Sequence, residues 1–382
     1  MASRSSSESA LGLLIIDFSL KTYDIDHCPR FIALSYVWGT DAPRNEITVN
    51  GQRFFTRDNL WDALRRLSQL RRREQFFWID AICINQDDVK ERAHQVNMMQ
   101  DIFSRADMII AWLGLPDPDS DLVMDAIRAR SRNVGGNNDG GWSVQKAVKS
   151  FVRRPYFQRM WIVQEVLLSP TVQVLCGPRF CLWDDMAKFI LRKNWPSEMA
   201  IPGTTDALLS RWMDRSTPRS GNSQTSLHAM IYDFHPAKCA DPRDSVYALL
   251  GLVTAPRLGS STLVADYTIS TAQLYHQTLG HLSKSLGRPE DYLDREILKL
   301  KLRTALRLPG DIGRLFHVVE MLSSSSSHGS MYEIELAFSD DEHGVLRIAH
   351  TFSAGTSLDG IVQQRLTACR ILVWPGSETT IS

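Results

Sequence analysis

Residues 76–114, FFWIDAICINQDDVKERAHQVNMMQDIFSRADMIIAWLG, decide the fold of this chain. The apolar run 76–79 predicts a short buried strand, and the carboxylate of Asp80 follows at its polar tip. Apolar residues then recur at helical spacing over 88–103, and a second apolar run, 108–113, predicts another strand. Strand, helix and strand in this order indicate a parallel crossover, the unit from which α/β sheets are built.

The loop between the first strand and the helix carries candidate site residues. Asp88 followed three residues later by Glu91 is typical of a capped helix start, so the loop lies directly before it. In open α/β sheets ligands bind outside the carboxyl ends of the strands, which places Asp80, Asn85 and Gln86 at a candidate site. The alternative is that Asp80 and Asn85 only cap and brace the turn.

The sequence before this stretch predicts a strand, a hairpin and a helix. Residues 31–34 form a short apolar run that brings the segment 35–39, SYVWG, to its carboxyl end. Two extended segments flank Asn50 and Gly51, a dipeptide typical of the two-residue turn that closes a β-hairpin. Leucines at helical spacing over 60–67 then predict a helix.

Composition excludes several functional classes. The 382 residues include 43 Lys+Arg and 43 Asp+Glu, so no net charge favours nucleic acid or an anionic membrane as partner. The six cysteines are scattered and Asp17 interrupts the N-terminal apolar run, so we expect a reduced, cytoplasmic protein without a membrane span. Neither a strong metal-ligand spacing nor a phosphate-binding glycine loop is present, so no metal and no cofactor are expected. A thiol–imidazole pair of Cys83 and His94 is a weak alternative nucleophile.

We expect four segments along the chain. They are a flexible Ser-rich leader (1–29, with 1–10 disordered), an α/β domain (30–178), a mainly helical region (179–322), and a linker with a tail (323–382). Within the tail, 332–338 and 345–348 have the composition of strands.

The carboxylate of Glu165 is the strongest catalytic candidate. It lies four residues after Trp161 on a predicted helix, and that spacing puts both side chains on one face. An aromatic plane and a carboxylate could then contact the same ligand. The alternative is a structural ion pair of Glu165 with Arg159 or Arg154, the more common fate of a helical glutamate.

Three blocks of the sequence resemble the signature blocks of the fungal heterokaryon-incompatibility (HET) domain family. They are FIALSYVWG (31–39), the opening stretch (76–114) and RRPYFQRMWIVQEV (153–166). KCADPRDSVYALLGL (238–252) and the later Asp266-Tyr267 resemble the segment that commonly follows that domain. The order and spacing of the blocks fit, and the resemblance covers residues 31–267.

The resemblance implies a role in fungal non-self recognition, where such domains trigger growth arrest or programmed cell death when incompatible cells fuse. It also implies a distant likeness to TIR domains, flavodoxin-like α/β modules that assemble as signalling scaffolds or cleave NAD. In TIR enzymes the catalytic Glu lies on a helix four residues after a Trp, and Trp161 and Glu165 match that pair. The usual Cys after the Trp is Ile162 here, and a long insertion, 116–154, precedes the pair.

The fold implied is a TIR-like, flavodoxin-like α/β domain with a mostly parallel sheet, flanking helices and an inserted hairpin, followed by a mainly helical region. If activity is retained, Glu165 stabilises the oxocarbenium-like ribose left when nicotinamide departs. The substrate-binding residues expected around it are Ser35, Trp38, Asp80, Asn85 and Trp161. Arg44 or Arg57 is placed to meet the diphosphate.

Two functions follow from these expectations. The first is an NAD+ glycohydrolase activated by oligomerisation, with NAD as substrate. The second is a non-enzymatic death-signalling or adaptor module that acts by self-association or with another incompatibility protein. A degenerate family member would have neither activity.

Overall fold

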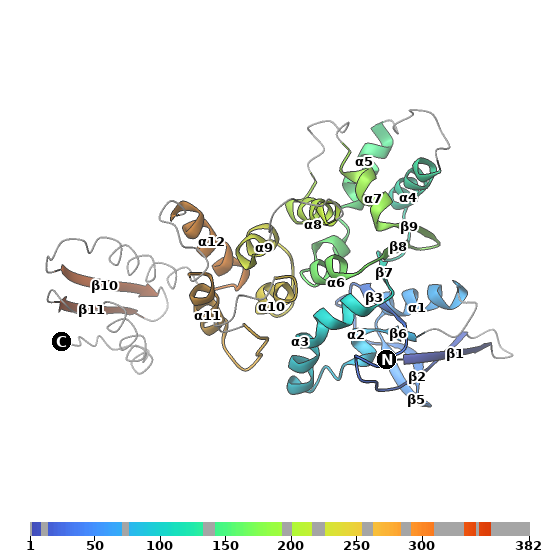
Figure 1. Ribbon diagram of the computed structural model, residues 1–382, viewed down its shortest axis with the longest axis horizontal. Coiled ribbons are helices and arrows are strands. Elements are labelled where there is room, and N and C mark those ends of the chain that lie inside the picture. Colours follow the sequence, from blue (N-terminus) through green and yellow to red (C-terminus); the bar gives the residue numbers. More distant parts are fainter. Residues whose placement is uncertain are drawn as a thin grey trace. The chain divides into compact units, whose positions relative to one another are not determined.

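The computed structural model has two compact units, Met1–Asp291 and Tyr292–Ser382, and each is described by itself (Figure 1). The residues it describes are 2–8, 14–70, 76–132, 142–192, 201–215, 226–253, 263–283, 292–308, 332–340 and 344–352.

Within these described residues, the first unit contains one nine-stranded sheet in the order β5-β4-β2-β1-β6-β3-β7-β8-β9. Its strands are β1 (Ala2–Glu8), β2 (Leu14–Leu20), β3 (Phe31–Tyr36), β4 (Asn45–Val49), β5 (Gln52–Thr56), β6 (Phe76–Trp78), β7 (Met108–Trp112), β8 (Val172–Cys176) and β9 (Arg179–Leu182). Its helices are α1 (Asp58–Leu70), α2 (Asp80–Cys83), α3 (Val89–Arg105), α4 (Pro118–Ser131), α5 (Trp142–Phe151), the 3-10 helix η1 (Pro155–Gln158), α6 (Ile162–Leu168), α7 (Trp183–Ile190), α8 (Gly203–Asp214), α9 (Leu227–Phe234), α10 (Asp244–Leu250) and α11 (Thr271–Ser283).

The centre of the sheet is parallel. Strand β3 pairs in parallel with β6 on one side and β7 on the other, and β7 pairs in parallel with β8. Counted along the chain, these four strands have the order 2-1-3-4, which is the beginning of the flavodoxin-like order. The predicted α/β fold with a parallel centre is therefore confirmed. In sheets of this order ligands bind where the carboxyl ends of the first and third strands diverge, which would be β3 and β7. The cavity described below is lined instead by residues that follow β3 and β6 and by the hairpin.

The predicted hairpin is confirmed as β4 and β5. Ile47 pairs with Phe54, and the turn residues Asn50 and Gly51 have φ values of 51° and 74°. Two positive φ values define the turn type whose twist matches the strands, and Asn-Gly adopts it at least cost. The hairpin joins the sheet through the parallel pairing of β2 with β4.

The expectation that residues 1–29 form a flexible leader is wrong for the segment of β2. Ile16 and Phe18 are each 1 % exposed, and they pack into the core formed with Leu60 and Leu64 of α1. Alternate residues on a strand reach the same face of the sheet, so Ile16, Phe18 and Leu20 share one face although Asp17 interrupts the apolar run. Strand β1, within the expected disordered stretch 1–10, pairs with β2 and β6.

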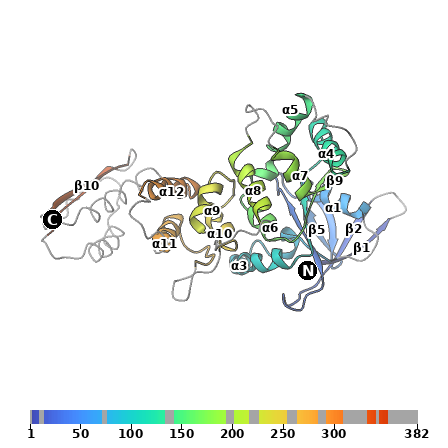
Figure 2. The ribbon, with the colours of Figure 1, turned by 45° about the horizontal axis from the view of Figure 1, so that its top comes forward.

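The two faces of the sheet are covered by different helices. Leu34 and Tyr36 of β3 join the core under α1. On the other face, Trp78 of β6 meets Phe103 of α3 edge to face, with ring centroids 5.4 Å apart. Figure 2 shows α3 and α6 on one side of the sheet and α1 on the other. Successive residues of β3 therefore point to different helix layers.

Helix α3 begins as its sequence predicts. The Asp88 side chain accepts hydrogen bonds from the backbone N–H groups of Lys90 and Glu91, at 2.9 and 3.2 Å. The Glu91 carboxylate does not return to Asp88 but accepts from the backbone N–H of Asn85 at 2.9 Å. The cap thereby also fixes the end of the loop that carries Asn85.

Replacing Asp88 with alanine is expected to cost about 1 kcal/mol of unfolding free energy, because the first turn of α3 loses its acceptor. Urea denaturation measures the change. Asp101→Ala, an exposed position on the same helix, is the matched control and should change stability by less than about 0.5 kcal/mol. Equal stability losses in the two variants would contradict the cap.

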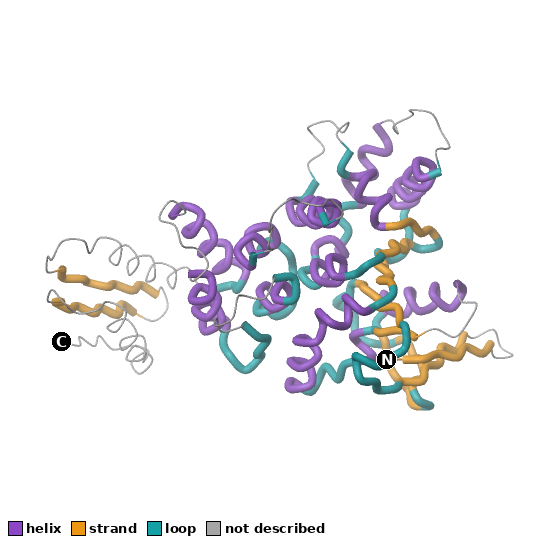
Figure 3. The backbone as a smooth tube through the Cα atoms, in the orientation of Figure 1, coloured by secondary structure: helices purple, strands orange, loops and turns teal. Residues whose placement is uncertain are grey.

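After β9 the first unit is helical, as predicted, and Figure 3 shows helices along most of this stretch. The sheet continues to Leu182 in β9, four residues beyond the expected end of the α/β domain. In the second unit, α12 (Tyr292–Ala305) precedes a hairpin of β10 (Tyr332–Asp340) and β11 (Gly344–Phe352). Both strands predicted in the tail are thus confirmed, and they pair with each other. The expected linker at 323–331 lies outside the described residues.

Candidate functional site

A buried polar cluster surrounds the carboxyl end of β3. We call it the β3-tip cluster, and it consists of Ser35, Tyr36, Asp80, Tyr156, Arg159 and Glu165. Ser35 donates a short hydrogen bond to Glu165 Oε2, and its Oγ lies 2.7 Å from the Tyr156 hydroxyl. Ser35 and Glu165 are 1 % and 3 % exposed. The central strand therefore holds the candidate carboxylate directly.

Arg159 is the cation of the cluster. Its Nη2 lies 3.5 Å from Glu165 Oε1, and its side chain is 17 % exposed against 4 % for Glu165. Its charge also acts on Asp80, so one guanidinium serves two carboxylates. The Nη1 atom of Arg159 is buried and has no hydrogen-bond partner among the described residues. The guanidinium thus keeps one N–H group from which a ligand oxygen could accept a hydrogen bond.

Burial controls the protonation of this cluster. It raises the pKa of Glu165, while the Arg159 charge and the Ser35 hydrogen bond oppose the rise. Burial likewise raises the pKa of Asp80, against the effects of Arg159 and the Trp38 indole. The pKa of the Tyr156 hydroxyl is also raised, chiefly by burial, so this group stays protonated. Arg159 is therefore the group that favours the charged form of both carboxylates most strongly.

Asp80 fixes the orientation of Trp38. The indole N–H of Trp38 donates to Asp80 Oδ2 at 2.7 Å, and Asp80 Oδ1 accepts from the backbone N–H of Ala81 at the same distance. Tyr36 also donates to Asp80. The bracing role considered for Asp80 is present, and it acts on residues that line a cavity.

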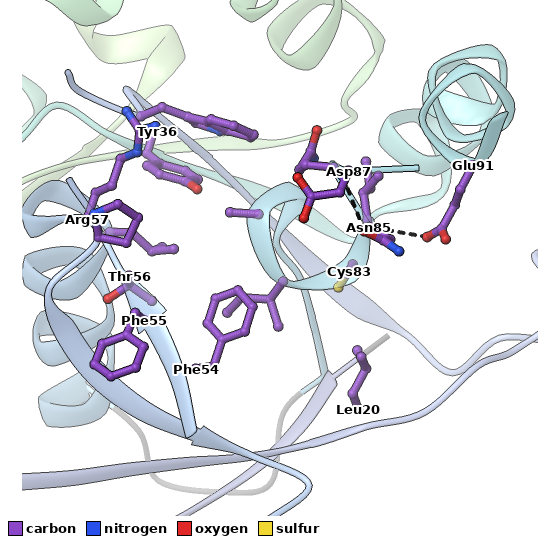
Figure 4. A pocket seen from close by; sticks show the side chains of 17 residues that line it. Leu20, Tyr36, Phe54, Phe55, Thr56, Arg57, Cys83, Asn85, Asp87 and Glu91 are labelled. Carbon is purple, nitrogen blue, oxygen red and sulfur yellow. Dashed lines mark hydrogen bonds between the residues drawn. The ribbon is translucent and has the colours of Figure 1, made fainter. Parts of the chain in front are cut away.

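The cavity lies beside the cluster and has a volume of about 630 Å³ (Figure 4). Its wall combines aromatic rings from Tyr36, Trp38 and Phe54 with polar groups such as Arg57 and Asn85. A volume in this range and a mostly apolar wall with a few polar groups are typical of small-molecule sites. Figure 4 shows side chains from the hairpin and from the 83–91 segment facing the same space.

Glu165 does not line the cavity. Ser35, which binds Glu165, and Tyr36, which lines the cavity, are consecutive residues of β3 and point to opposite faces of the sheet. Asp80 and Arg159 connect the two sides around the strand end, because Asp80 binds Trp38 and lies close to Arg159.

The structure separates Trp161 from the other expected ligand residues. Trp161 precedes α6, and its indole N–H donates to Asp244 Oδ2 at 3.1 Å. The ion pair considered for Glu165 is present with Arg159, whereas Arg154 pairs with Asp117. The expected role of Trp161 in stacking on a ligand stays a prediction.

The other candidates lie as follows. Arg57 lines the cavity and donates to the backbone oxygen of Gly39 at 2.5 Å, whereas Arg44 is exposed and pairs with Asp58. Burial raises the pKa of the Cys83 thiol, which disfavours the thiolate needed by a nucleophile.

Sequence reasoning missed Tyr156 as a site residue and considered Arg159 only as a structural partner. Both stand in the block 153–166, close before the Trp161–Glu165 pair. Asp244 was also missed, since the segment around it reads as an ordinary helix start. A signal that could have found Tyr156 and Arg159 is the presence of polar residues in the otherwise apolar segment YFQRMW. Buried polar groups form hydrogen bonds with one another, so such residues are candidates for a buried polar cluster.

Asp244 is expected to contribute to the pH dependence of stability. It accepts from the Tyr267 hydroxyl at 2.6 Å as well as from Trp161, and burial raises its pKa to about 6 from an ordinary value of 3.8. A native pKa above the unfolded one means that stability is full below the unfolded value and falls as the pH rises towards 6. The loss should approach about 3 kcal/mol above pH 6, since one pKa unit equals about 1.4 kcal/mol.

Asp244→Asn should lack the stability loss that ionisation of Asp244 causes, because the amide does not titrate. The test is the difference in unfolding free energy between wild type and this variant, measured by urea denaturation at pH 4 and pH 7. Asp80 and Glu165 titrate in both proteins, so their contributions cancel. A difference that stays constant over this range would contradict the raised pKa.

Comparison with known proteins gives a family match that includes all six residues of the β3-tip cluster. The profile of the family described as Heterokaryon incompatibility protein (HET) matches residues 31–165, from the first residue of β3 to Glu165. The matched region thus begins with β3 and ends on α6, the two elements that carry Ser35 and Glu165.

A curated relative extends the match beyond the HET domain. Heterokaryon incompatibility protein 6, OR allele, of Neurospora crassa is 31 % identical over 327 residues, which cover 67 % of this chain and 48 % of the relative. This chain belongs to the HET family. It spans about half the length of the curated relative it matches. No solved structure matches the chain significantly.

The described residues form neither a metal-binding group nor a membrane-spanning helix. No group of three or more His, Cys, Asp or Glu side chains among the described residues could hold a metal ion. In the same part of the chain, no helix has both the length and the apolar character to cross a membrane.

Proposed function

We propose that this HET protein acts in fungal non-self recognition and triggers cell death by cleaving NAD+, with Glu165 as the catalytic carboxylate. The observation that carries the proposal is the pairing of Glu165 with Ser35 at the carboxyl end of β3, beside a cavity of about 630 Å³. The family match and the Neurospora crassa relative support the role in incompatibility. The likeness of the Trp161–Glu165 pair to TIR enzymes supports the reaction.

In the proposed reaction the bond between nicotinamide and C1′ of the ribose breaks, and nicotinamide leaves as a neutral molecule. The ribose then carries a positive charge, which a nearby carboxylate stabilises electrostatically. Water adds to C1′ and loses a proton, giving ADP-ribose. Glu165 has to be ionised for this role, and Arg159 together with Ser35 favours its ionised form.

The remaining residues position the substrate. Trp38, held by Asp80, offers an aromatic face in the cavity, and Arg57 offers a charge for the diphosphate. The free Nη1 of Arg159 offers a donor between the cavity and Glu165. Entry of the ribose then requires Arg159 to exchange its contact with Glu165 for one with the substrate.

A second function is favoured by a specific observation. Glu165 is 3 % exposed and lies outside the cavity lining. A carboxylate in this position is also suited to a purely structural ion pair with Arg159. The domain would then act without catalysis, as an adaptor that signals cell death by self-association.

One experiment separates the two functions. The purified full chain, fused to an oligomerising domain, is incubated with NAD+, and nicotinamide is quantified by chromatography. The same fusion is expressed in a fungal host to score growth arrest. Nicotinamide release together with arrest supports the enzyme. Arrest without release, unchanged in Glu165→Gln, would establish the adaptor and overturn the enzyme.

A further inference from the structure

Two segments beyond the family match lie close to the turn before α6, the helix that carries Glu165: one is bonded to this turn, and the other is bonded to the first. We call residues 238–245 and 265–269 the strap. Lys238 forms a parallel bridge with Arg159, in which the Lys238 N–H donates to Gln158 O at 2.6 Å and Met160 N–H donates to Lys238 O at 2.9 Å. The backbone directly before α6 is therefore held by a residue more than seventy positions later in the chain.

The strap makes a second contact through a buried carboxylate. Asp244, 8 % exposed, accepts from the Trp161 indole at 3.1 Å and from the Tyr267 hydroxyl at 2.6 Å. The backbone oxygen of Trp161 accepts from the N–H of Glu165 at 3.1 Å. Two hydrogen bonds thus lead from Asp244 to the backbone of Glu165.

The strap is itself rigid. Arg243 Nη1 donates to the backbone oxygens of Tyr267 and Ile269, at 2.6 and 2.8 Å, so one side chain joins its two segments. Arg243 is in turn held by Asp241, with Nη2 2.7 Å from Asp241 Oδ2. Arg243 thereby holds the backbone of Tyr267 next to the segment that carries Asp244, so the Tyr267 hydroxyl can donate to Asp244.

The strap is also anchored on α3. Arg92 lies over the Tyr267 ring, 4.4 Å from its centroid, and Asn97 exchanges two hydrogen bonds with the backbone of Ala265, at 2.9 and 3.2 Å. The strap therefore ties α3 to the start of α6 from outside the sheet. Both helices cover the face of the sheet on which Ser35 binds Glu165.

We propose that Asp244 is a positioning residue, which fixes the turn before α6 through Trp161 and so sets the place of Glu165 relative to Ser35. The assignment of a catalytic role to Glu165 rests on the proposed function, but the fixing of the turn does not. A buried carboxylate costs free energy that an apolar residue would avoid, and its two hydrogen bonds offset part of that cost. On this view the functional unit of the HET domain extends to residue 269.

The test uses three variants of the full chain. Asp244→Ala removes both acceptors, Trp161→Phe removes only the indole donor, and Asp244→Asn keeps an oxygen for the indole at nearly the same shape. Asp266→Asn is the matched control, because the Asp266 side chain bonds only Thr268 within the strap. Far-UV circular dichroism confirms that each variant is folded.

The first readout is amide hydrogen exchange of peptides covering 158–168, measured by mass spectrometry. Loss of one directed hydrogen bond corresponds to about tenfold faster exchange, so Asp244→Ala and Trp161→Phe should each show about that increase. Asp244→Asn and the control should exchange within about twofold of wild type. Wild-type exchange in Asp244→Ala would overturn the fixing of the turn.

The second readout is the split between kcat and KM for nicotinamide release. Displacement of Glu165 should lower kcat of Asp244→Ala about tenfold with KM nearly unchanged, and Asp244→Asn should restore most of it. Faster exchange with an unchanged kcat would overturn the positioning of Glu165. If wild type releases no nicotinamide, the proposed function fails, and the exchange result still decides whether Asp244 fixes the turn.

Discussion

Glutamine in place of Glu165 is expected to lower kcat for nicotinamide release by about 10²–10³-fold, the range found when one preorganised electrostatic group is removed from an active site. The amide keeps the shape of the side chain, so it can still accept from Ser35. It loses the negative charge that would face the developing ribose cation. The effect should therefore fall on kcat, while KM changes little.

The matched control for this substitution is Glu46→Gln. Glu46 lies on β4, its side chain is 47 % exposed, and it pairs with Arg53 at the surface. This control should retain wild-type activity. Equal nicotinamide release from Glu165→Gln and wild type would assign Glu165 to the structural ion pair alone.

Methionine in place of Arg159 is expected to destabilise the first unit by about 3–5 kcal/mol, the cost of leaving a buried charge without its partner. Removal of the guanidinium leaves Asp80 and Glu165 close together with no compensating cation. Both carboxyl pKa values should rise further, because the group that lowers them is gone. Urea denaturation at pH 7 measures the loss.

A control variant and a double variant test whether the stability loss of Arg159→Met comes from the unpaired carboxylates. Arg30→Met removes an exposed arginine, whose side chain is 87 % exposed and pairs with Asp107 at 2.7 Å, and should cost less than about 1 kcal/mol. Adding Glu165→Gln to Arg159→Met should recover part of the stability, because one unpaired charge is then removed as well. Wild-type stability of Arg159→Met would show that the two carboxylates do not depend on its charge.

Local patterns were sufficient to predict much of the fold. The apolar runs gave β3, β6 and β7, and Asp88 gave the start of α3, because these features depend on neighbours within a few residues. Asn50-Gly51 predicted the hairpin for the same reason. Strand β2 was missed although most of its residues are apolar, because Asp17 interrupts the run, and a short alternation of apolar residues does not identify a strand apart from its partners.

The candidate site could be predicted only in part. The rule that ligands gather at the carboxyl ends of parallel strands placed Ser35, Trp38 and Asp80 in one region. Trp38 is bonded to Asp80, whereas Ser35 is bonded to Glu165 on the other face of the sheet. Helical spacing also suggested that Trp161 and Glu165 share a face. Spacing could not show that the Trp161 indole is already bonded to Asp244, since that partner stands 83 positions later in the chain.

The sequence by itself determined that this is an α/β protein of the HET family, with a carboxylate at position 165 on the helix before β8. Only the tertiary structure decided what surrounds that carboxylate. Ser35 lies 130 positions before Glu165, and no local pattern specifies a contact between such distant residues. The contact exists because β3 occupies the centre of the sheet, and because Arg159 and the strap hold the turn before α6 against its end.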